Sequence, residues 1–200
     1  LLDLELAMKQ DELVWDPEDD RPYTYEDLQL TDKDGTVVLS LNLADDVLGY
    51  EGIPSDTVLN LSNIKHYEPR DFFRPIQKEG DYVYLKKGSF YILSTYESVR
   101  IPPDLASEMG PMDERSGEFR SHYAGFLDPG WGWGKDGDGH GRPFTLEVRP
   151  FEDIIVRHRQ PIAKIRFERL SELPPFNYDS IDSNYTRQER PKLSKHFKDE

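Results

Sequence analysis

The sequence has no cysteine among its 200 residues, so the chain can form neither a disulfide nor a thiolate-ligated zinc site of its own. It also lacks any apolar run that approaches the roughly 20 residues needed to span a bilayer. The first residues, LLDLELAMKQDE, carry acidic side chains early and have no basic start, which does not fit a signal peptide. We therefore expect a cytoplasmic protein with no membrane partner.

Positive charge is scarce, because 25 Lys and Arg oppose 39 Asp and Glu and give a formal net charge of -14 at pH 7. Such a charge repels the phosphates of a nucleic acid, so we exclude a general nucleic-acid binder. One segment differs from the rest. Residues 187–198 hold five basic residues against a single acidic one, a net charge of +4. A basic tail of this kind can close on a small polyanion, although a solvated terminus has the same composition.

Turn residues are abundant, since fifteen Pro and fourteen Gly favour many turns over long helices. Short β-rich segments, spaced about ten residues apart, predict an all-β barrel or sandwich. These segments are 36–43, 57–63, 81–99 (two strands joined as a hairpin at Lys87-Gly88), 118–131, 144–148, 153–156 and 162–170. We divide the chain into an N-terminal arm or linker (1–30), one β-domain (31–173) and a flexible C-terminal tail (174–200).

Two places in the sequence could carry chemistry. Arg115, Ser116 and Gly117 combine a guanidinium, a hydroxyl and a flexible backbone, which can wrap phosphate oxygens but equally fit a surface turn. In the segment 144–148, alternation places Thr145 and Glu147 on the face opposite the apolar side chains. In a partly dry cleft Glu147 could act as a general acid and base, whereas a solvated glutamate is the commoner case.

Six segments in register resemble those of the dCTP deaminase/dUTPase family over roughly residues 30–197. In chain order they are DGTVVLSLNL, YVYLKKGSFYILSTYESVRIPPDLA, RSGEFR, AGFLDPGW, TLEV with PIAKIRFERL, and NYTRQERPKLSKHF. The resemblance implies a distorted, jelly-roll-like β-barrel of the dUTPase type with few short helices. It also implies a homotrimer or pseudo-trimer whose active sites are shared between neighbouring subunits.

The same resemblance implies zinc-independent hydrolysis of dCTP to dUTP and ammonia. Mg²⁺ would arrive on the nucleotide triphosphate, and the protein would hold no metal of its own. Glu147 stands at the position of the catalytic glutamate. Arg120 would keep that carboxylate ionised and oriented, and Ser116 would bond the attacking water or a phosphate.

The residues that would contact the substrate follow from the resemblance as well. Arg115 would face the triphosphate, and the backbone near Tyr123 and Ala124 would read the exocyclic amino group. Tyr185 and Gln188 match tail residues that fold over the nucleotide. The remaining expected substrate contacts are Gly117, Asp128 and Trp131.

The chain departs from the family pattern in three places. Gly117 replaces a serine, Asn184 replaces a tail lysine, and residues 131–142 form an insertion that we expect to be a mobile loop at the mouth of the cleft. These departures fit a long form of the family in which two such halves are fused, this chain resembling the C-terminal half. Two alternatives stay open: a dUTP diphosphatase or bifunctional enzyme in which Asp128 activates water, and a non-catalytic half that binds nucleotide or builds the trimer.

Overall fold

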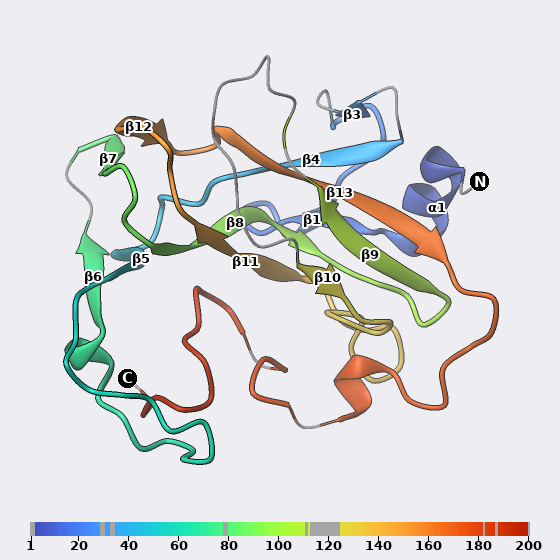
Figure 1. Ribbon diagram of the computed structural model, residues 1–200. Coiled ribbons are helices and arrows are strands. Elements are labelled where there is room, and N and C mark those ends of the chain that lie inside the picture. Colours follow the sequence, from blue (N-terminus) through green and yellow to red (C-terminus); the bar gives the residue numbers. More distant parts are fainter. Residues whose placement is uncertain are drawn as a thin grey trace.

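The protein is seen here as a computed structural model that describes residues 3–28, 31–32, 35–77, 80–110, 112, 125–181, 183–186 and 188–199. It is mostly antiparallel β-structure with one short α-helix in the described residues (Figure 1). The predicted all-β class with few short helices is confirmed. No helix in the described ranges has the length and apolar character needed to cross a membrane.

The strands are β1 (Val14–Asp16), β2 (Arg21–Pro22), β3 (Thr31–Asp32), β4 (Thr36–Ser40), β5 (Val47–Gly52), β6 (Phe73–Gln77), β7 (Tyr82–Leu85), β8 (Tyr91–Val99), β9 (Leu105–Gly110), β10 (Phe126–Leu127), β11 (Arg142–Val148), β12 (Ile154–Arg157) and β13 (Pro161–Arg169). The helices are α1 (Leu4–Asp11) and the short 3-10 turns η1 (Pro69–Asp71) and η3 (Tyr178–Ser180).

Strand β8 is the centre of the larger sheet. All nine of its residues are buried, and its two edges pair with β11 on one side and with β5 and β1 on the other. The second sheet has the order β10-β9-β13-β4-β3. A bridge between Leu41 and Thr95 joins the two sheets, and the apolar side chains between them form the main core.

A buried carboxylate reinforces this junction. Glu97 on β8 accepts hydrogen bonds from the Ser40 amide at 2.7 Å and from Ser40 Oγ at 2.6 Å. Burial raises the pKa of Glu97, because removing a carboxyl group from water disfavours its charged form. The two sheets are thus tied by a buried polar contact.

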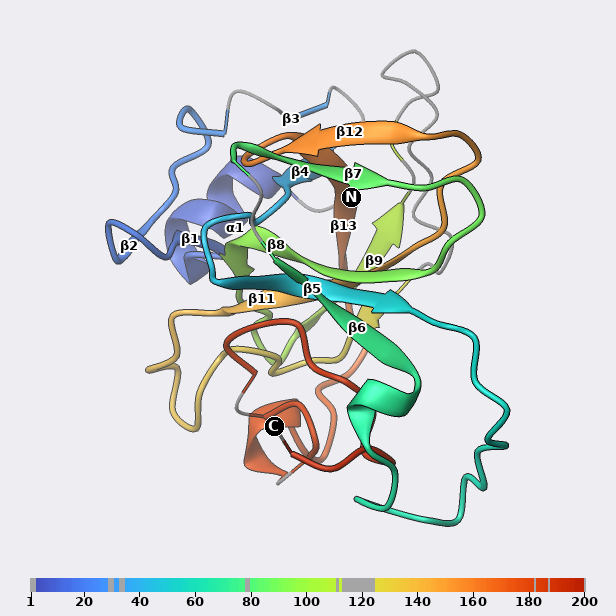
Figure 2. The same cartoon turned by 90° about the vertical axis from the view of Figure 1, so that its left-hand side faces the viewer.

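Two strand predictions were wrong. The residues on either side of Lys87-Gly88 do form strands, but β7 pairs with β12 in a separate two-stranded sheet (Figure 2) and does not form a hairpin with β8. The segment 57–63 is not a strand; Val58 is 87% and Leu61 69% exposed, while Leu59 is partly buried. Of the predicted strand 118–131, β10 is formed, and residues 118–124 lie outside the described residues.

The N-terminal segment packs on the core. Asp3 caps α1 by accepting a hydrogen bond from the backbone three residues on, and Glu12 ends the helix in a left-handed conformation with φ 51°. Leu6 of the helix is exposed. The buried side chains of the helix are Leu4, Ala7 and Met8. The expected division into arm, β-domain and tail stays a prediction.

Strand β1 continues this contact by pairing with the end of β8. Trp15 stacks on His140 with ring centroids 3.9 Å apart, and His140 Nδ1 lies 2.8 Å from Asp20 Oδ1. Residues near the start of the chain therefore touch the insertion that follows Trp131.

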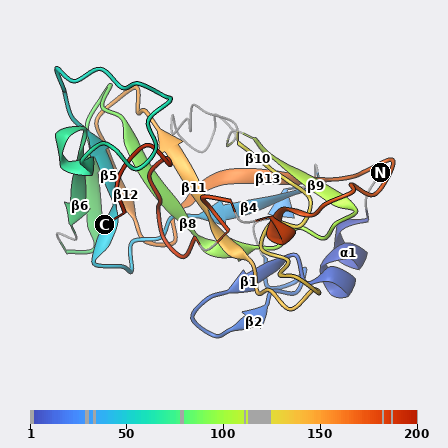
Figure 3. The same ribbon diagram turned by 90° about the horizontal axis from the view of Figure 1, so that it is seen from below.

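The C-terminal tail, orange to red in Figure 1, runs beneath β11 and β8, as the view from below also shows (Figure 3). Its end lies beside the long connection between β5 and β6. The Lys65 amide donates to the Lys195 carbonyl at 2.9 Å, and the Lys198 amide donates to the Tyr67 carbonyl at 2.9 Å. Phe197 packs among the aromatic rings of that connection. The tail thus closes one side of the fold over β11.

Candidate functional site

A cleft of about 580 Å³ opens between β11, the turn after β10 and the C-terminal tail. Eight aromatic side chains line it: Phe73, Phe90, Phe126, Trp131, Phe144, Tyr178, Tyr185 and Phe197. Six polar side chains share the lining: Asp128, Thr145, Glu147, Gln188, Lys192 and Ser194. A concave, largely aromatic surface with a few polar groups suits a flat ring that is oriented by hydrogen bonds.

Glu147 enters this cleft from β11. The predicted alternation is confirmed, because Phe144, Leu146 and Val148 are buried in the core while Thr145 and Glu147 line the cleft. The strand holds this register by pairing antiparallel with β8. The carboxylate therefore projects from a rigid element toward the cleft, where Glu147 itself is exposed to solvent and open to a bound ligand.

Gln188 fastens the tail to the same strand. Its side-chain Nε2 donates to the Pro143 carbonyl at 3.2 Å and to Thr145 Oγ1 at 2.6 Å, and the residue is only 3% exposed. Both amide hydrogens are thus used within the protein. The structure thus gives Gln188 an anchoring role on Thr145, two residues before Glu147 in the strand, which sequence reasoning did not foresee.

Tyr185 lies on the tail beside Glu147. Burial raises the pKa of its phenol, and the nearby Tyr178 and the negative charge of Glu147 raise it further. The ring stays neutral and packs against the core. The tail therefore contributes an aromatic wall and an electrostatic neighbour to the carboxylate.

The turn Asp128-Pro129-Gly130-Trp131 forms another wall of the cleft. It closes with a hydrogen bond from the Trp131 amide to the Asp128 carbonyl at 3.1 Å, and Gly130 has φ 86°. A side chain at Gly130 would collide with Asn177 of the tail. The Tyr178 amide donates to the Pro129 carbonyl at 2.7 Å. Glycine here allows the tail to approach closely enough to place Tyr178 in the cleft.

A buried ion pair fixes the start of the tail. Arg142 Nη1 and Nη2 donate to the two carboxylate oxygens of Asp179 at 2.6 and 2.8 Å. The Gly134 amide donates to the same carboxylate at 2.8 Å, and the Asp179 side chain is 3% exposed. The Arg142 guanidinium also lies over the Trp131 ring, 5.5 Å from its centroid. These contacts position η3 against the turn that lines the cleft.

The insertion 131–142 differs from the expected loop at the mouth of the cleft. Of these residues, all of which the structure describes, only Trp131 lines the cleft. Gly134 and Arg142 bind Asp179 of the tail, and His140 contacts Trp15 and Asp20 of the N-terminal segment. Arg100 Nη1 pairs with Glu12 at 2.9 Å, and its Nη2 donates to the Gly137 carbonyl at 2.6 Å. The insertion therefore joins the N-terminal segment to the tail.

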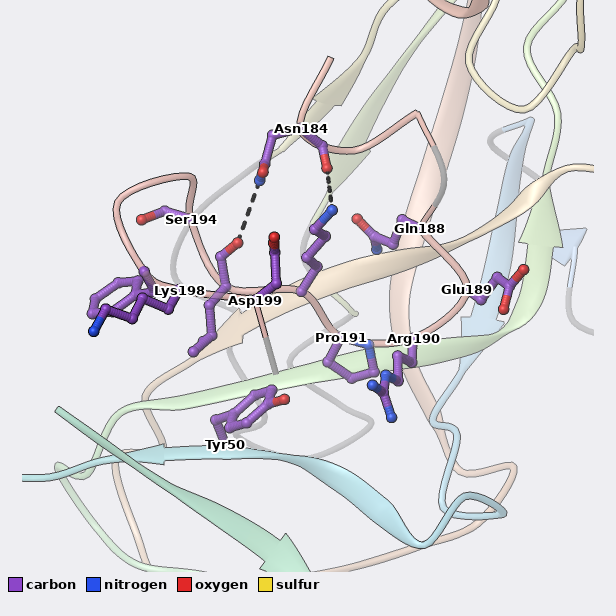
Figure 4. A pocket seen from close by; sticks show the side chains of 12 residues that line it. Tyr50, Asn184, Gln188, Glu189, Arg190, Pro191, Ser194, Lys198 and Asp199 are labelled. Carbon is purple, nitrogen blue, oxygen red and sulfur yellow. Dashed lines mark hydrogen bonds between the residues drawn. The ribbon is translucent and has the colours of Figure 1, made fainter. Parts of the chain in front are cut away.

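The tail also encloses a smaller pocket of about 250 Å³ that adjoins the cleft (Figure 4). Asn184 lies at this pocket, and its backbone carbonyl accepts a hydrogen bond from Lys192 Nζ at 2.6 Å. Four residues line both cavities: Gln188, Lys192, Ser194 and Phe197. The two spaces are thus neighbours along the same segment of chain.

The predicted site residues divide into two groups. The structure brings Glu147, Asp128, Trp131, Tyr185 and Gln188 to one cleft. The other six lie outside the described residues, and their roles stay predictions: Arg115, Ser116, Gly117, Arg120, Tyr123 and Ala124. Within the described ranges, no group of three or more His, Asp or Glu side chains is arranged to hold a metal ion.

Sequence reasoning missed Tyr178 and Lys192 as cleft residues. Tyr178 is an aromatic residue in a polar tail, which is a weak signal for a binding surface. Lys192 belongs to the basic segment 187–198, whose net charge pointed to a polyanion without singling out one lysine.

Comparisons with known proteins show which family the chain resembles. The family model described as "2'-deoxycytidine 5'-triphosphate deaminase (DCD), C-terminal domain" matches residues 7–197. Two proteins named "dCTP deaminase, dUMP-forming" are similar in sequence. The one from Streptomyces avermitilis is 32% identical and the one from Streptomyces griseus is 31% identical over 137 residues. Each match covers 65% of this chain and 67% of the relative.

The fold also matches a solved structure, the 2'-deoxycytidine 5'-triphosphate deaminase from Agrobacterium tumefaciens. The TM-score is 0.70 at 31% sequence identity. The match covers 84% of this chain and 47% of the solved chain, so the present chain spans about half the length of that relative.

Proposed function

The chain belongs to the 2'-deoxycytidine 5'-triphosphate deaminase family, and we propose that it hydrolyses the C4 amino group of dCTP with Glu147 as the proton-transferring residue. The observation that carries this proposal is the position of Glu147. It stands on a paired strand inside an aromatic cleft, beside the docked tail. Such a cleft can stack a pyrimidine ring while the carboxylate faces one of its edges.

In this reaction a water molecule attacks C4 of cytosine. The Glu147 carboxylate takes a proton from that water and passes it to N3, so that a tetrahedral intermediate forms. The carboxylate then moves the remaining hydroxyl proton to the amino group, which leaves as ammonia. The water has supplied one oxygen to the ring and two protons, one to N3 and one to ammonia, and the product is the uracil nucleotide.

The rest of the site is proposed from the resemblance. Arg120 and Ser116 would orient the carboxylate and the water, and Arg115 would face the triphosphate. We propose that Mg²⁺ enters bound to the triphosphate of the substrate and that the deamination needs no zinc. We also propose that the protein works as a trimer or pseudo-trimer in the cytoplasm.

Two observations favour a second reaction. Asp128 lines the same cleft as Glu147, and the two Streptomyces relatives are named as dUMP-forming. We propose that Asp128 could activate a second water that attacks the α-phosphorus and breaks its bond to the β-phosphate oxygen. The products would then be dUMP and pyrophosphate in place of dUTP.

The test is to incubate the protein with dCTP and Mg²⁺, with and without a zinc chelator that spares Mg²⁺, and to separate the products by chromatography. Glu147→Gln should lower turnover by about a hundredfold or more, the usual effect of removing a general base. Glu168→Gln is the matched control, because Glu168 is an exposed strand glutamate on β13, outside the cleft.

Each product pattern decides between the alternatives. Formation of dUTP supports deamination alone, and formation of dUMP supports the bifunctional reaction, in which case Asp128→Asn should shift the product to dUTP. Unchanged turnover in Glu147→Gln would overturn the assignment of the base. Nucleotide binding without any turnover in the unaltered protein would support the non-catalytic alternative.

A further inference from the structure

A lysine of the tail lies where the cleft meets the smaller pocket. Lys192 lines both cavities. In the described part of the chain it is the only cationic residue that lines the cleft, which otherwise presents the carboxylates of Asp128 and Glu147. Among the described residues, Lys192 is the one basic residue shared by the two cavities, in a chain whose net charge is -14.

The ammonium group of Lys192 lies near the carboxylate of Asp199, whose pKa is lowered mainly by its hydrogen bond with Lys65 and in smaller part by the charge of Lys192. Its Nζ donates to the backbone carbonyl of Asn184 at 2.6 Å, and no carboxylate among the described residues forms an ion pair with it. Its neighbours differ, because Lys198 pairs with Glu68 and Lys65 pairs with Asp199. A lysine ammonium has three donors, so two remain for a ligand after the bond to Asn184.

We propose that Lys192 binds the β- or γ-phosphate of the nucleotide and thereby sets the preference for a triphosphate over a monophosphate. The proposal rests on the proposed function, since it takes the pyrimidine ring to lie beside Glu147. The phosphate chain would then extend along the tail toward the smaller pocket, whose other charged lining residues are Glu189, Arg190, Lys198 and Asp199. A phosphate oxygen is a ligand that the two remaining donors of this ammonium group can bind through charge-assisted hydrogen bonds.

The position of Lys192 is fixed by the docked tail. Pro191 and Leu193 on either side of it are buried, and Leu193 packs with Tyr50, Ile92 and Phe197 in a second apolar cluster. The buried neighbours therefore fix the backbone of Lys192, and the hydrogen bond from Nζ to the Asn184 carbonyl orients its side chain. This arrangement presents a pre-positioned cation, which lowers the entropy cost of holding a phosphate.

The experiment measures equilibrium binding by calorimetry in the Glu147→Gln background, so that turnover does not consume the ligand. The probes are dCTP and dCMP, each with Mg²⁺. Loss of one charge-assisted contact should weaken dCTP binding by about tenfold or more in Lys192→Met. Binding of dCMP should change little, and Lys192→Arg should keep most of the dCTP affinity.

Lys195→Met is the matched control, because Lys195 is an exposed lysine of the same tail that lines neither cavity. Equal weakening of dCTP and dCMP in Lys192→Met would overturn the proposal, since it would indicate a general role in docking the tail. Unchanged dCTP affinity, or absence of dCTP binding to the parent protein, would overturn it as well.

The result is separable from the test of the proposed function. If the unaltered protein binds dCTP but does not turn it over, deamination fails while the ratio of dCTP to dCMP affinity still decides the role of Lys192. If turnover is confirmed and the ratio does not respond to Lys192→Met, this inference alone fails.

Discussion

Removal of the amide of Gln188 should loosen the C-terminal tail without disturbing the sheets. Gln188→Leu keeps the side-chain size but deletes the hydrogen bonds to the Pro143 carbonyl and to Thr145 Oγ1. Each such bond contributes about 1 kcal/mol net, and the buried acceptors left behind lose their partners, so the tail should be destabilised by roughly 2 kcal/mol. Added leucine burial offsets a small part of this.

The assay is native-state hydrogen exchange followed by mass spectrometry. A loss of about 2 kcal/mol should speed exchange of the tail amides by about 30-fold, since 1.4 kcal/mol is a factor of ten. Thr145→Val removes only one of the two bonds and should speed exchange by about fivefold. The double variant should resemble Gln188→Leu alone, because both changes delete the same contact.

The control is Gln10→Leu, which makes the same substitution at an exposed position of α1. Exchange of residues 188–199 should not change in that variant. If Gln188→Leu also leaves the exchange of those residues within about twofold of the unaltered protein, the two hydrogen bonds do not hold the tail and the reasoning is refuted.

Two further substitutions test the core. Because burial raises the pKa of Glu97 above its ordinary value near 4.5, the folded state resists losing this proton and stability falls as pH rises through the unfolded and then the folded pKa. Glu97→Gln abolishes that loss of stability. The melting temperature of Glu97→Gln minus that of the unaltered protein should therefore increase from pH 4 to pH 8. A difference that stays constant over this range would contradict the raised pKa of Glu97. Gly49 has φ 152°, and a side chain there would collide with the Ile92 carbonyl. Gly49→Ala should therefore lower the free energy of unfolding, measured by urea denaturation, by about 3 kcal/mol or more. A loss under about 1 kcal/mol would show that β5 can shift to accommodate the methyl group.

Alternating hydrophobicity predicted those parts of the fold whose two faces differ in environment. The segment 144–148 is the clearest case, because its apolar side chains had to meet the core and so fixed the direction of Glu147. Alternation fails where no partner strand is available. The segment 57–63 has the pattern, but it lies in an exposed connection and its backbone does not join a sheet.

Pairing partners were less predictable than strands. Gly88 does form the expected turn, with φ 74° and a hydrogen bond from the Ser89 amide to the Lys86 carbonyl. A turn signal describes only the local backbone, however, and the partner of β7 is decided by distant contacts with β12. The turn signal in the sequence thus predicted the position of the turn but not which strands pair.

The candidate site shows the same limit. Glu147 was predictable from its strand, whereas Tyr178 and Lys192 lie in a tail without any regular pattern. Their positions depend on nonlocal hydrogen bonds to Pro129 and Asn184. No periodicity in the tail encodes these contacts, so only the folded chain reveals which of its aromatic and basic residues face the cleft.

The insertion at 131–142 makes the N-terminal segment and the rest of the fold depend on each other for their contacts. Arg100 is held by Glu12 and by the insertion, and Trp15 stacks on His140. A fragment that began at residue 31 would keep every strand of the second sheet, yet it would lose the contacts of His140 with Trp15 and Asp20 and the ion pair of Arg100 with Glu12. Anyone trimming this protein for crystallisation or for fusion to another domain should therefore treat residues 3–28 as part of the scaffold of the cleft.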